Sequence, residues 1–232
     1  MKAVRRSQPL AGREHELEPV RGLPEQLPAG EQLLWQGSPE WKRLAQRAFH
    51  VRKLVVYFAA LTALRVAVLL GGAPSAGEVA LSVVWMAVLG GTALGLLSLL
   101  AWLSARATVY SITNRRVVMR IGIVLTLTFN IPFKRITGAG LHLEADGSGD
   151  LPLALTGEDR IAWLHLWPHA RPWRLAHPEP MLRSVPQAAE VARVLSEAWS
   201  RSTGLSVVPQ DAAVAAPRAA DNGGGRPALA GR

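Results

Sequence analysis

The sequence predicts an α+β membrane protein, in which a two-helix transmembrane hairpin is followed by a small β-barrel or sandwich that ends in a helix. Three observations predict this class. Two apolar segments, residues 54–72 and 79–103, follow one another across a short link. Beyond residue 105 the hydrophobic pattern changes from helical to alternating, which is typical of strands. Residues 186–201 then return to a helical pattern.

The composition excludes several classes of site. The 232-residue chain has no cysteine, which excludes disulfides, thiolate metal sites and a cysteine nucleophile. Its net charge of +9 would suit nucleic acid or an anionic lipid surface. Because the chain also carries two apolar spans, we expect anionic membrane lipids as a partner, and no nucleic acid.

Residues 1–53 form a basic arm. They carry ten lysines and arginines, and four prolines in the first thirty residues predict a loose chain there. Residues 38–53 instead predict a helix with Trp41, Leu44 and Phe49 on one face and basic residues elsewhere. This helix is expected either to lie on a membrane surface or to pack on the following domain, and the pattern leaves both open.

The two spans come next. A transmembrane helix needs about 20 apolar residues. Residues 54–72 just meet this with one internal charge, and residues 79–103 contain no charge in 25 positions. The arm before the spans is rich in lysine and arginine, whereas the link between them has neither. The positive-inside rule therefore predicts a multi-pass protein with both termini in the cytoplasm.

Residues 105–203 predict the β domain. Six segments are rich in Val, Ile, Thr and aromatic residues and are separated by turn residues: 107–114, 116–122, 124–133, 136–145, 151–157 and 161–167. A helix over 186–201 is opened by Pro186 and closed by Gly204. Residues 204–232 consist mainly of Ala, Pro and Gly, which predicts a disordered tail.

The spans contain two sets of candidate contact residues. Arg65 lies near the middle of the first span, and neither span offers a carboxylate. It is expected either to extend to the headgroups or to meet an acceptor on a partner chain. Ala87, Gly91 and Gly95 form a stripe of small residues, which permits close helix approach either within the hairpin or to another protein's helix.

The β domain contains the other candidates. Arg115, Arg116 and Arg120 predict a basic strand pair held near the cytoplasmic leaflet, where it either contacts lipid or is simply solvated. Trp163, Trp167 and Trp173 are expected in the core or on a contact surface. His165 and His169 lie among them, and we expect rim histidines rather than a metal or pigment site, because Pro168 interrupts the helix such a pair needs.

The sequence contains no catalytic motif. There is no G-x-S-x-G, no phosphate-binding glycine loop and no H-E-x-x-H. Asp146 and Asp150 flank a glycine turn that makes a weak calcium loop at best. We therefore expect a protein that is not an enzyme and holds no resident cofactor.

Two motifs in the β domain resemble a known family. "YSITNRR" and "IPFKRI" fit Y-x-x-T-x-R-R at Tyr110 to Arg116 and I-P-x-x-x-I at Ile131 to Ile136. This order of motifs, behind a two-span hairpin, resembles the bacterial pleckstrin-homology-like (PH-like) membrane proteins. The resemblance implies that the cytoplasmic β domain is a PH-like barrel or sandwich.

A longer similarity covers about residues 20–200. "LPAGEQLLWQGSPEWKRLAQRAFHVRKL" and "AWLHLWPHARPWRLAHPEPMLRSVP" resemble the PuhB-type photosynthetic-complex assembly proteins of purple bacteria. This resemblance implies an assembly factor in the bacterial inner, intracytoplasmic membrane that transiently binds reaction-centre or core antenna polypeptides. It also implies self-association, which a homodimer would satisfy, and it leaves transient contact with bacteriochlorophyll open. The alternatives are a generic lipid-binding PH-like membrane protein unconnected with photosynthesis, and a pigment or ion transport component.

Overall fold

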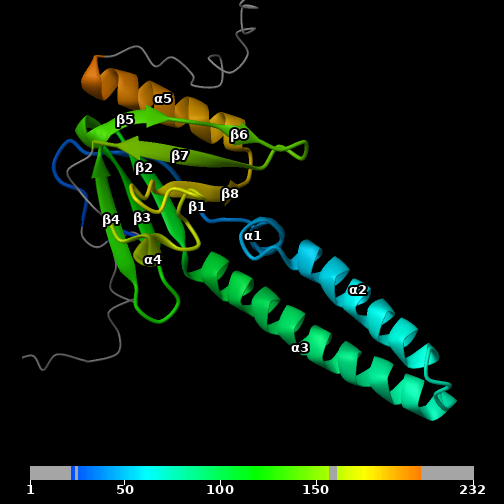
Figure 1. Ribbon diagram of the computed structural model, residues 1–232. Coiled ribbons are helices and arrows are strands. Elements are labelled where there is room, and N and C mark those ends of the chain that lie inside the picture. Colours follow the sequence, from blue (N-terminus) through cyan, green and yellow to red (C-terminus); the bar gives the residue numbers. More distant parts are fainter. Residues whose placement is uncertain (1–21, 24–25, 157–160, 205–232) are drawn as a thin grey trace, which may run out of the picture.

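The computed structural model of the chain describes residues 22–23, 26–156 and 161–204. Figure 1 shows two parts: a β domain covered by a helix, and a long helical hairpin that projects away from it. The predicted α+β class, with the helices before the sheet and one helix after it, is confirmed. Residues 1–21 of the predicted arm and residues 205–232 of the predicted tail lie outside the described part.

The hairpin consists of α2, Val51–Leu70, and α3, Ala76–Ala107. Both helices are long and apolar enough to cross a membrane. None of the most hydrophobic window of α2, and 6% of that of α3, is buried inside the protein. A soluble core helix would be mostly covered, so these faces suit a lipid environment. At about 1.5 Å per residue, α3 is roughly 18 Å longer than α2, and its C-terminal end meets the β domain (Figure 1).

The segment before the hairpin is shorter as a helix than predicted. α1 covers only Trp41–Arg47, and His50 in a left-handed conformation, with φ of 53°, separates it from α2. Leu44 and Ala45 are buried against Ala101 and Ala105 of α3. Of the two expectations for this helix, the structure therefore supports packing on the rest of the protein.

The first sheet contains β1, Leu33–Gly37; β2, Val109–Thr113; β3, Arg116–Ile121; and β4, Leu127–Pro132. They pair antiparallel in the order β1-β2-β3-β4. β1 was not predicted, because the residues before the hairpin were assigned to a loose arm. It pairs with β2 through Trp35 and Ile112, so part of the arm belongs to the β domain.

The second sheet contains β5, Ile136–Ala139; β6, His142–Leu143; β7, Gly149–Leu155; and β8, Met181–Val185. β7 is central and pairs with the other three strands. A 3₁₀ turn, η1, Phe133–Arg135, links the two sheets. β8 was missed by the sequence analysis because its partner is distant in sequence.

The segment 161–167 was predicted as a strand, and this prediction is wrong. It contains a single helical turn, α4, Trp163–Leu166. One turn brings Trp163 and Leu166 to the same side, where Leu166 is buried and Trp163 packs against the core. The three-residue spacing of these apolar side chains therefore suits a turn of helix, while Leu164 and His165 face outward.

α5, Ala188–Thr203, covers the sheets (Figure 1). Val191, Leu195 and Ala198 lie on its buried face. Their side chains join the core formed by Tyr110, Val117 and other residues of both sheets. Gly204 ends the helix with φ of 69°, which confirms the predicted stop.

Candidate contact surfaces and the junction between hairpin and domain

A buried chain of hydrogen bonds joins the end of α3 to the β domain. The His169 ring is 0% exposed and lies between Tyr110 of β2 and Thr108, the residue that ends α3. Tyr110 Oη is 2.6 Å from His169 Nδ1, and Thr108 Oγ1 is 3.0 Å from His169 Nε2. The prediction that His169 is a rim histidine is therefore wrong.

The direction of these hydrogen bonds follows from the donors available. The Thr108 hydroxyl donates to the Ser104 carbonyl oxygen at 2.7 Å, so Thr108 Oγ1 accepts from His169 Nε2–H. His169 Nδ1 then carries no proton and accepts from the Tyr110 hydroxyl. The Tyr110 oxygen in turn accepts from the Arg183 backbone N–H at 3.1 Å. Each group is satisfied only if the imidazole is neutral.

Burial keeps the His169 imidazole neutral and the Tyr110 hydroxyl protonated. Desolvation, assisted by the positive charge of Arg183, lowers the pKa of His169 from 6.5 to about 3. Desolvation also raises the pKa of the Tyr110 hydroxyl well above its usual range. At neutral pH the histidine is therefore uncharged and the tyrosine remains a donor.

Arg183 extends the junction to α1. Its Nη1 donates to the Pro168 carbonyl oxygen at 2.9 Å, and its Nη2 donates to the Arg47 carbonyl oxygen at 3.1 Å. The Glu40 N–H at the start of α1 donates to the Ser184 carbonyl oxygen at 2.8 Å. These bonds connect α1, β8 and the loop after α4. Because α1 also packs on α3, the hairpin is fixed to the domain at two places.

Within the hairpin, Arg65 has an acceptor that the sequence analysis missed. Its Nε donates to Ser82 Oγ on α3 at 3.2 Å. Glu78 is not the acceptor for Arg65, because its side chain forms a capping box with Ser75 at the start of α3. Ser82 lies 17 positions from Arg65 in sequence, so only the antiparallel arrangement of the helices brings the two together.

The small-residue stripe faces away from the hairpin partner. A Cβ on Gly90 would meet Phe58 of α2 at 3.2 Å, so Gly90 is the glycine at the close approach. A Cβ on Gly91 or Gly95 would meet no atom within 4 Å among the described residues. The expectation that Gly91 and Gly95 pack inside the hairpin is therefore wrong, and both lie on its outer surface.

The basic strand pair is less open than the sequence suggested. Arg116 Nε lies 2.8 Å from Glu31 Oε1, and its Nη1 donates to Asn130 at 3.3 Å. The Arg115 guanidinium lies over Gly30, and Arg120 is partly buried with interactions of its own. Glu31, the acidic residue before β1, thus neutralises part of the face for which either lipid contact or simple solvation was predicted.

The motif residues around this turn have structural roles. Thr113 Oγ1 accepts from the N–H groups of Arg115 and Arg116 at 3.2 and 3.0 Å, and its hydroxyl donates to the Arg116 carbonyl oxygen at 3.0 Å. This arrangement closes the turn between β2 and β3. Together with the role of Tyr110 at the junction, it explains why this spacing of Tyr and Thr suits the fold.

The three tryptophans do not form one cluster. Trp163 packs against the core, whereas Trp167 is partly exposed and meets Phe49 edge-on, with ring centroids 5.2 Å apart. Trp173 is 92% exposed and has a left-handed backbone, with φ of 65°. The core expectation therefore holds for Trp163, and Trp167 and Trp173 remain available for contacts.

The structure exposes one further apolar feature. The turn between β3 and β4 carries Val124 and Leu125, which are 89% and 80% exposed. The sequence analysis assigned both to a strand, whose alternation would have buried one of them. No group of three or more metal-ligating side chains occurs among residues 22–23, 26–156 and 161–204.

Comparisons with known proteins agree with this architecture. Residues 56–199 match the family described as the bacterial PH domain, a range that includes most of the hairpin and almost all of the β domain. The chain is also 37% identical over 190 residues to an uncharacterized 23.7 kDa protein in the puhA 5′ region of Rhodobacter capsulatus, which covers 82% of this chain and 89% of the relative. No solved structure matches. The chain therefore belongs to the bacterial PH domain family.

Proposed function

We propose that this protein is a non-enzymatic membrane assembly factor for the photosynthetic reaction centre and core antenna complex, as its resemblance to the PuhB-type proteins implies. The observation that carries the proposal is the 37% identity to a protein in the puhA 5′ region. That location supports a connection with photosynthesis. The similarity extends over 82% of this chain, so it includes both the hairpin and the β domain.

The hairpin supplies the surface for transient binding. Its outer faces are apolar and are not covered by other described parts of the protein. Gly91 and Gly95 leave room for the backbone of another helix to approach, and such close packing drives helix association in lipid. In the proposed mechanism this surface shields the apolar helices of newly made subunits until their neighbours arrive.

The proposed topology places the β domain in the cytoplasm. Ten lysines and arginines precede α2, and the link between the helices has none. This bias predicts that the link faces the opposite side of the bacterial inner membrane. Trp167, Trp173 and the apolar turn between β3 and β4 would then be presented to cytoplasmic parts of the same subunits.

Site-specific photo-crosslinking in native membranes tests this proposal. A photoreactive residue at Gly91, Gly95 or Trp167 is expected to capture reaction-centre or antenna polypeptides. The same residue at Phe58, which packs inside the hairpin against Gly90, is the matched control and should give only intramolecular products. Capture of a second copy alone from all three test positions would contradict the assembly role.

Deletion and co-purification separate this function from a generic lipid-binding role. Deleting the gene is expected to lower reaction-centre levels, and the tagged protein should co-purify with photosynthetic polypeptides. Unchanged reaction-centre levels together with recovery of anionic lipid alone would favour a PH-like membrane protein unconnected with photosynthesis. Bound bacteriochlorophyll would favour a pigment-handling role.

A further inference from the structure

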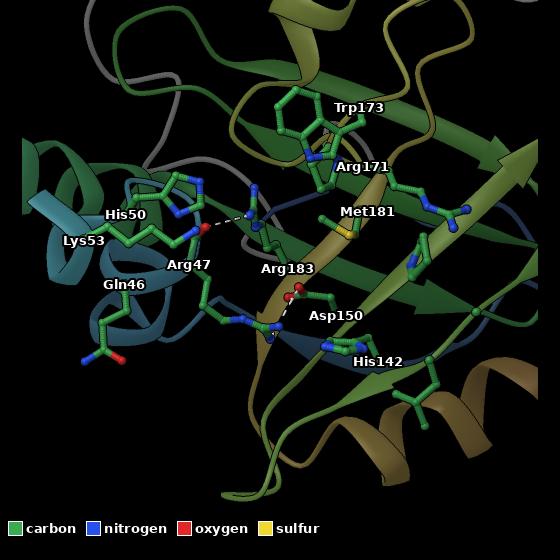
Figure 2. Close-up of a pocket in the computed structure, with 14 residues that line it drawn as sticks. Gln46, Arg47, His50, Lys53, His142, Asp150, Arg171, Trp173, Met181 and Arg183 are labelled. Atoms are coloured by element: carbon green, nitrogen blue, oxygen red, sulfur yellow. Dashed lines mark hydrogen bonds and ion pairs between the residues drawn. The ribbon is translucent and has the colours of Figure 1, made fainter. Parts of the chain in front are cut away.

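An open groove of about 780 Å³ lies where the chain passes from α1 into α2. Figure 2 shows its walls: Arg47, His50 and Lys53 on one side, and Asp150, Met181 and Arg183 from β7 and β8 beneath and opposite. The loop after α4 contributes Arg171 and Trp173. Its volume lies within the range of about 300–1,000 Å³ that small-ligand sites occupy.

The groove has an excess of positive charge. Arg47 lies 2.7 Å from Glu144 and 3.5 Å from Asp150, and Arg171 lies 2.7 Å from Glu179. Lys53 also lines the groove, but it makes no ion pair with any described residue. Lys53 and the buried Arg183 therefore line the groove without a salt bridge to any described residue.

Arg183 is held in an unusual state for a buried arginine. It is 9% exposed, and its Nη groups donate to carbonyl oxygens, while its Nε has no hydrogen-bond partner in the described part of the chain. Asp150, the nearest acid in the groove, already accepts from the Ser184 N–H at 2.8 Å. Because this Nε is itself buried, an anion that enters the groove stabilises Arg183 through its charge and not through a hydrogen bond to Nε.

The groove opens at the level where the apolar hairpin begins. His50 precedes the first residue of α2, and Lys53 lies in its first turn. That turn has no acidic residue and no side-chain cap, so its N–H groups and the positive end of the helix dipole face the same region. The exposed Trp173 is of the residue type that concentrates at the membrane–water interface.

We propose that this groove binds the phosphodiester headgroup of an anionic phospholipid from the leaflet in which α2 begins. Lys53 and the first turn of α2 contact the phosphate from the membrane side, and Arg183 stabilises it from beneath. The acyl chains lie along the exposed faces of the hairpin. A membrane lipid is the source, rather than soluble phosphate, because the groove opens beside an apolar helix.

This site differs from the basic strand pair that the sequence suggested for lipid contact. Arg116 is neutralised by Glu31, whereas Lys53 has no such partner among the described residues. The inference requires the hairpin to lie in a membrane but does not require a photosynthetic partner. The assembly role is tested by crosslinking from Gly91 and the lipid site by lipid binding, so one can fail without the other.

Lipid titration of the full chain in neutral detergent micelles tests the site. Native mass spectrometry counts the phosphatidylglycerol molecules that remain bound, with phosphatidylcholine as the zwitterionic comparison. We expect one retained phosphatidylglycerol per chain. Lys53→Gln should weaken its binding about tenfold, the usual effect of losing one charge-assisted hydrogen bond. The matched control is Arg52→Gln, which removes a neighbouring exposed charge that does not line the groove and should change binding less than about twofold.

Three results would overturn the proposal. Equal losses in Lys53→Gln and Arg52→Gln would indicate diffuse attraction without a groove site. Equal retention of phosphatidylcholine would remove the requirement for an anionic lipid. Displacement of the bound lipid by equimolar inorganic phosphate or glycerol phosphate would assign the groove to a soluble anion.

Discussion

Acidification is expected to destabilise the junction through His169. In the folded protein the His169 ring is neutral and has a pKa of about 3, whereas the pKa of a histidine in the unfolded chain is near 6.5. Below pH 6.5 the unfolded chain therefore binds more protons than the folded chain, and stability falls as pH falls. The contribution of His169 is fully present above pH 6.5 and is lost progressively between pH 6.5 and 3.

The magnitude follows from this difference in pKa. Each pH unit inside that window removes about 1.4 kcal/mol of unfolding free energy, so the loss between pH 7 and pH 5 is about 2 kcal/mol. For a chain of this size that corresponds to a decrease in Tm of about 4–8 °C. The pKa of Asp146 is lowered through its hydrogen bond with Ser148, so its contribution changes only at more acidic pH.

The assay compares thermal unfolding of the purified full chain in detergent at pH 7 and pH 5. His169→Asn removes the titrating ring but places an amide oxygen where the Tyr110 hydroxyl can still donate. This variant should be less stable at pH 7 and should lose less of its remaining stability on acidification. His165→Asn, at an exposed position, is the control and should retain the wild-type pH dependence. An identical decrease in Tm for wild type and His169→Asn would refute the reasoning.

Three further predictions concern the hairpin and the first sheet. Gly90→Leu should destabilise the hairpin by about 1–3 kcal/mol, because the new side chain overlaps the opposite helix. Gly91→Leu should change stability by less than about 0.5 kcal/mol, because its side chain meets no described atom. Thermal unfolding of both variants in detergent measures the difference. Ser82→Ala should cost about 0.6 kcal/mol, measured by steric-trap unfolding, and no change would mean that its hydrogen bond is not maintained in the membrane. Arg116→Gln should lower the free energy of unfolding by about 1–2 kcal/mol, because Glu31, whose side chain is 3% exposed, loses its cation. Adding Glu31→Gln should recover part of this loss in a double-mutant cycle. Purely additive effects of the two substitutions would argue against an interaction between these side chains.

The periodicity of the sequence was sufficient for the two hairpin helices, for α5 and for most strands of the β domain. Local patterns report which side of an element is apolar, so α2, α3, β2, β3 and α5 were predicted close to their observed positions. β1 and β8 were missed because their strand character depends on distant partners, β2 and β7. The segment 161–167 was mistaken for a strand because a short apolar run fits both alternation and one turn of helix.

For the candidate residues, too, the sequence identified some positions but did not predict their contacts. Arg65, Gly91 and Gly95 were identified from composition, but their orientation was not predictable, because hairpin packing depends on which faces of α2 and α3 meet. Nothing in the local sequence around Ser82 or Gly90 indicated that Ser82 accepts from Arg65 or that Gly90 lies at the close approach to Phe58. Arg183 and Lys53 carried no motif, and they share one groove only because α1, which leads into α2, packs on β8.

The sequence by itself determined the order of the parts and their environments: a basic arm, two apolar helices, alternating strands and a final amphipathic helix. These features follow from hydrophobicity and charge, which each segment carries independently of the others. Only the tertiary structure decided which polar groups became partners, because hydrogen bonds and ion pairs require atoms within about 3 Å. Tyr110 lies 59 positions from His169 and 73 from Arg183, and these residues meet only when β2, the loop after α4 and β8 pack together.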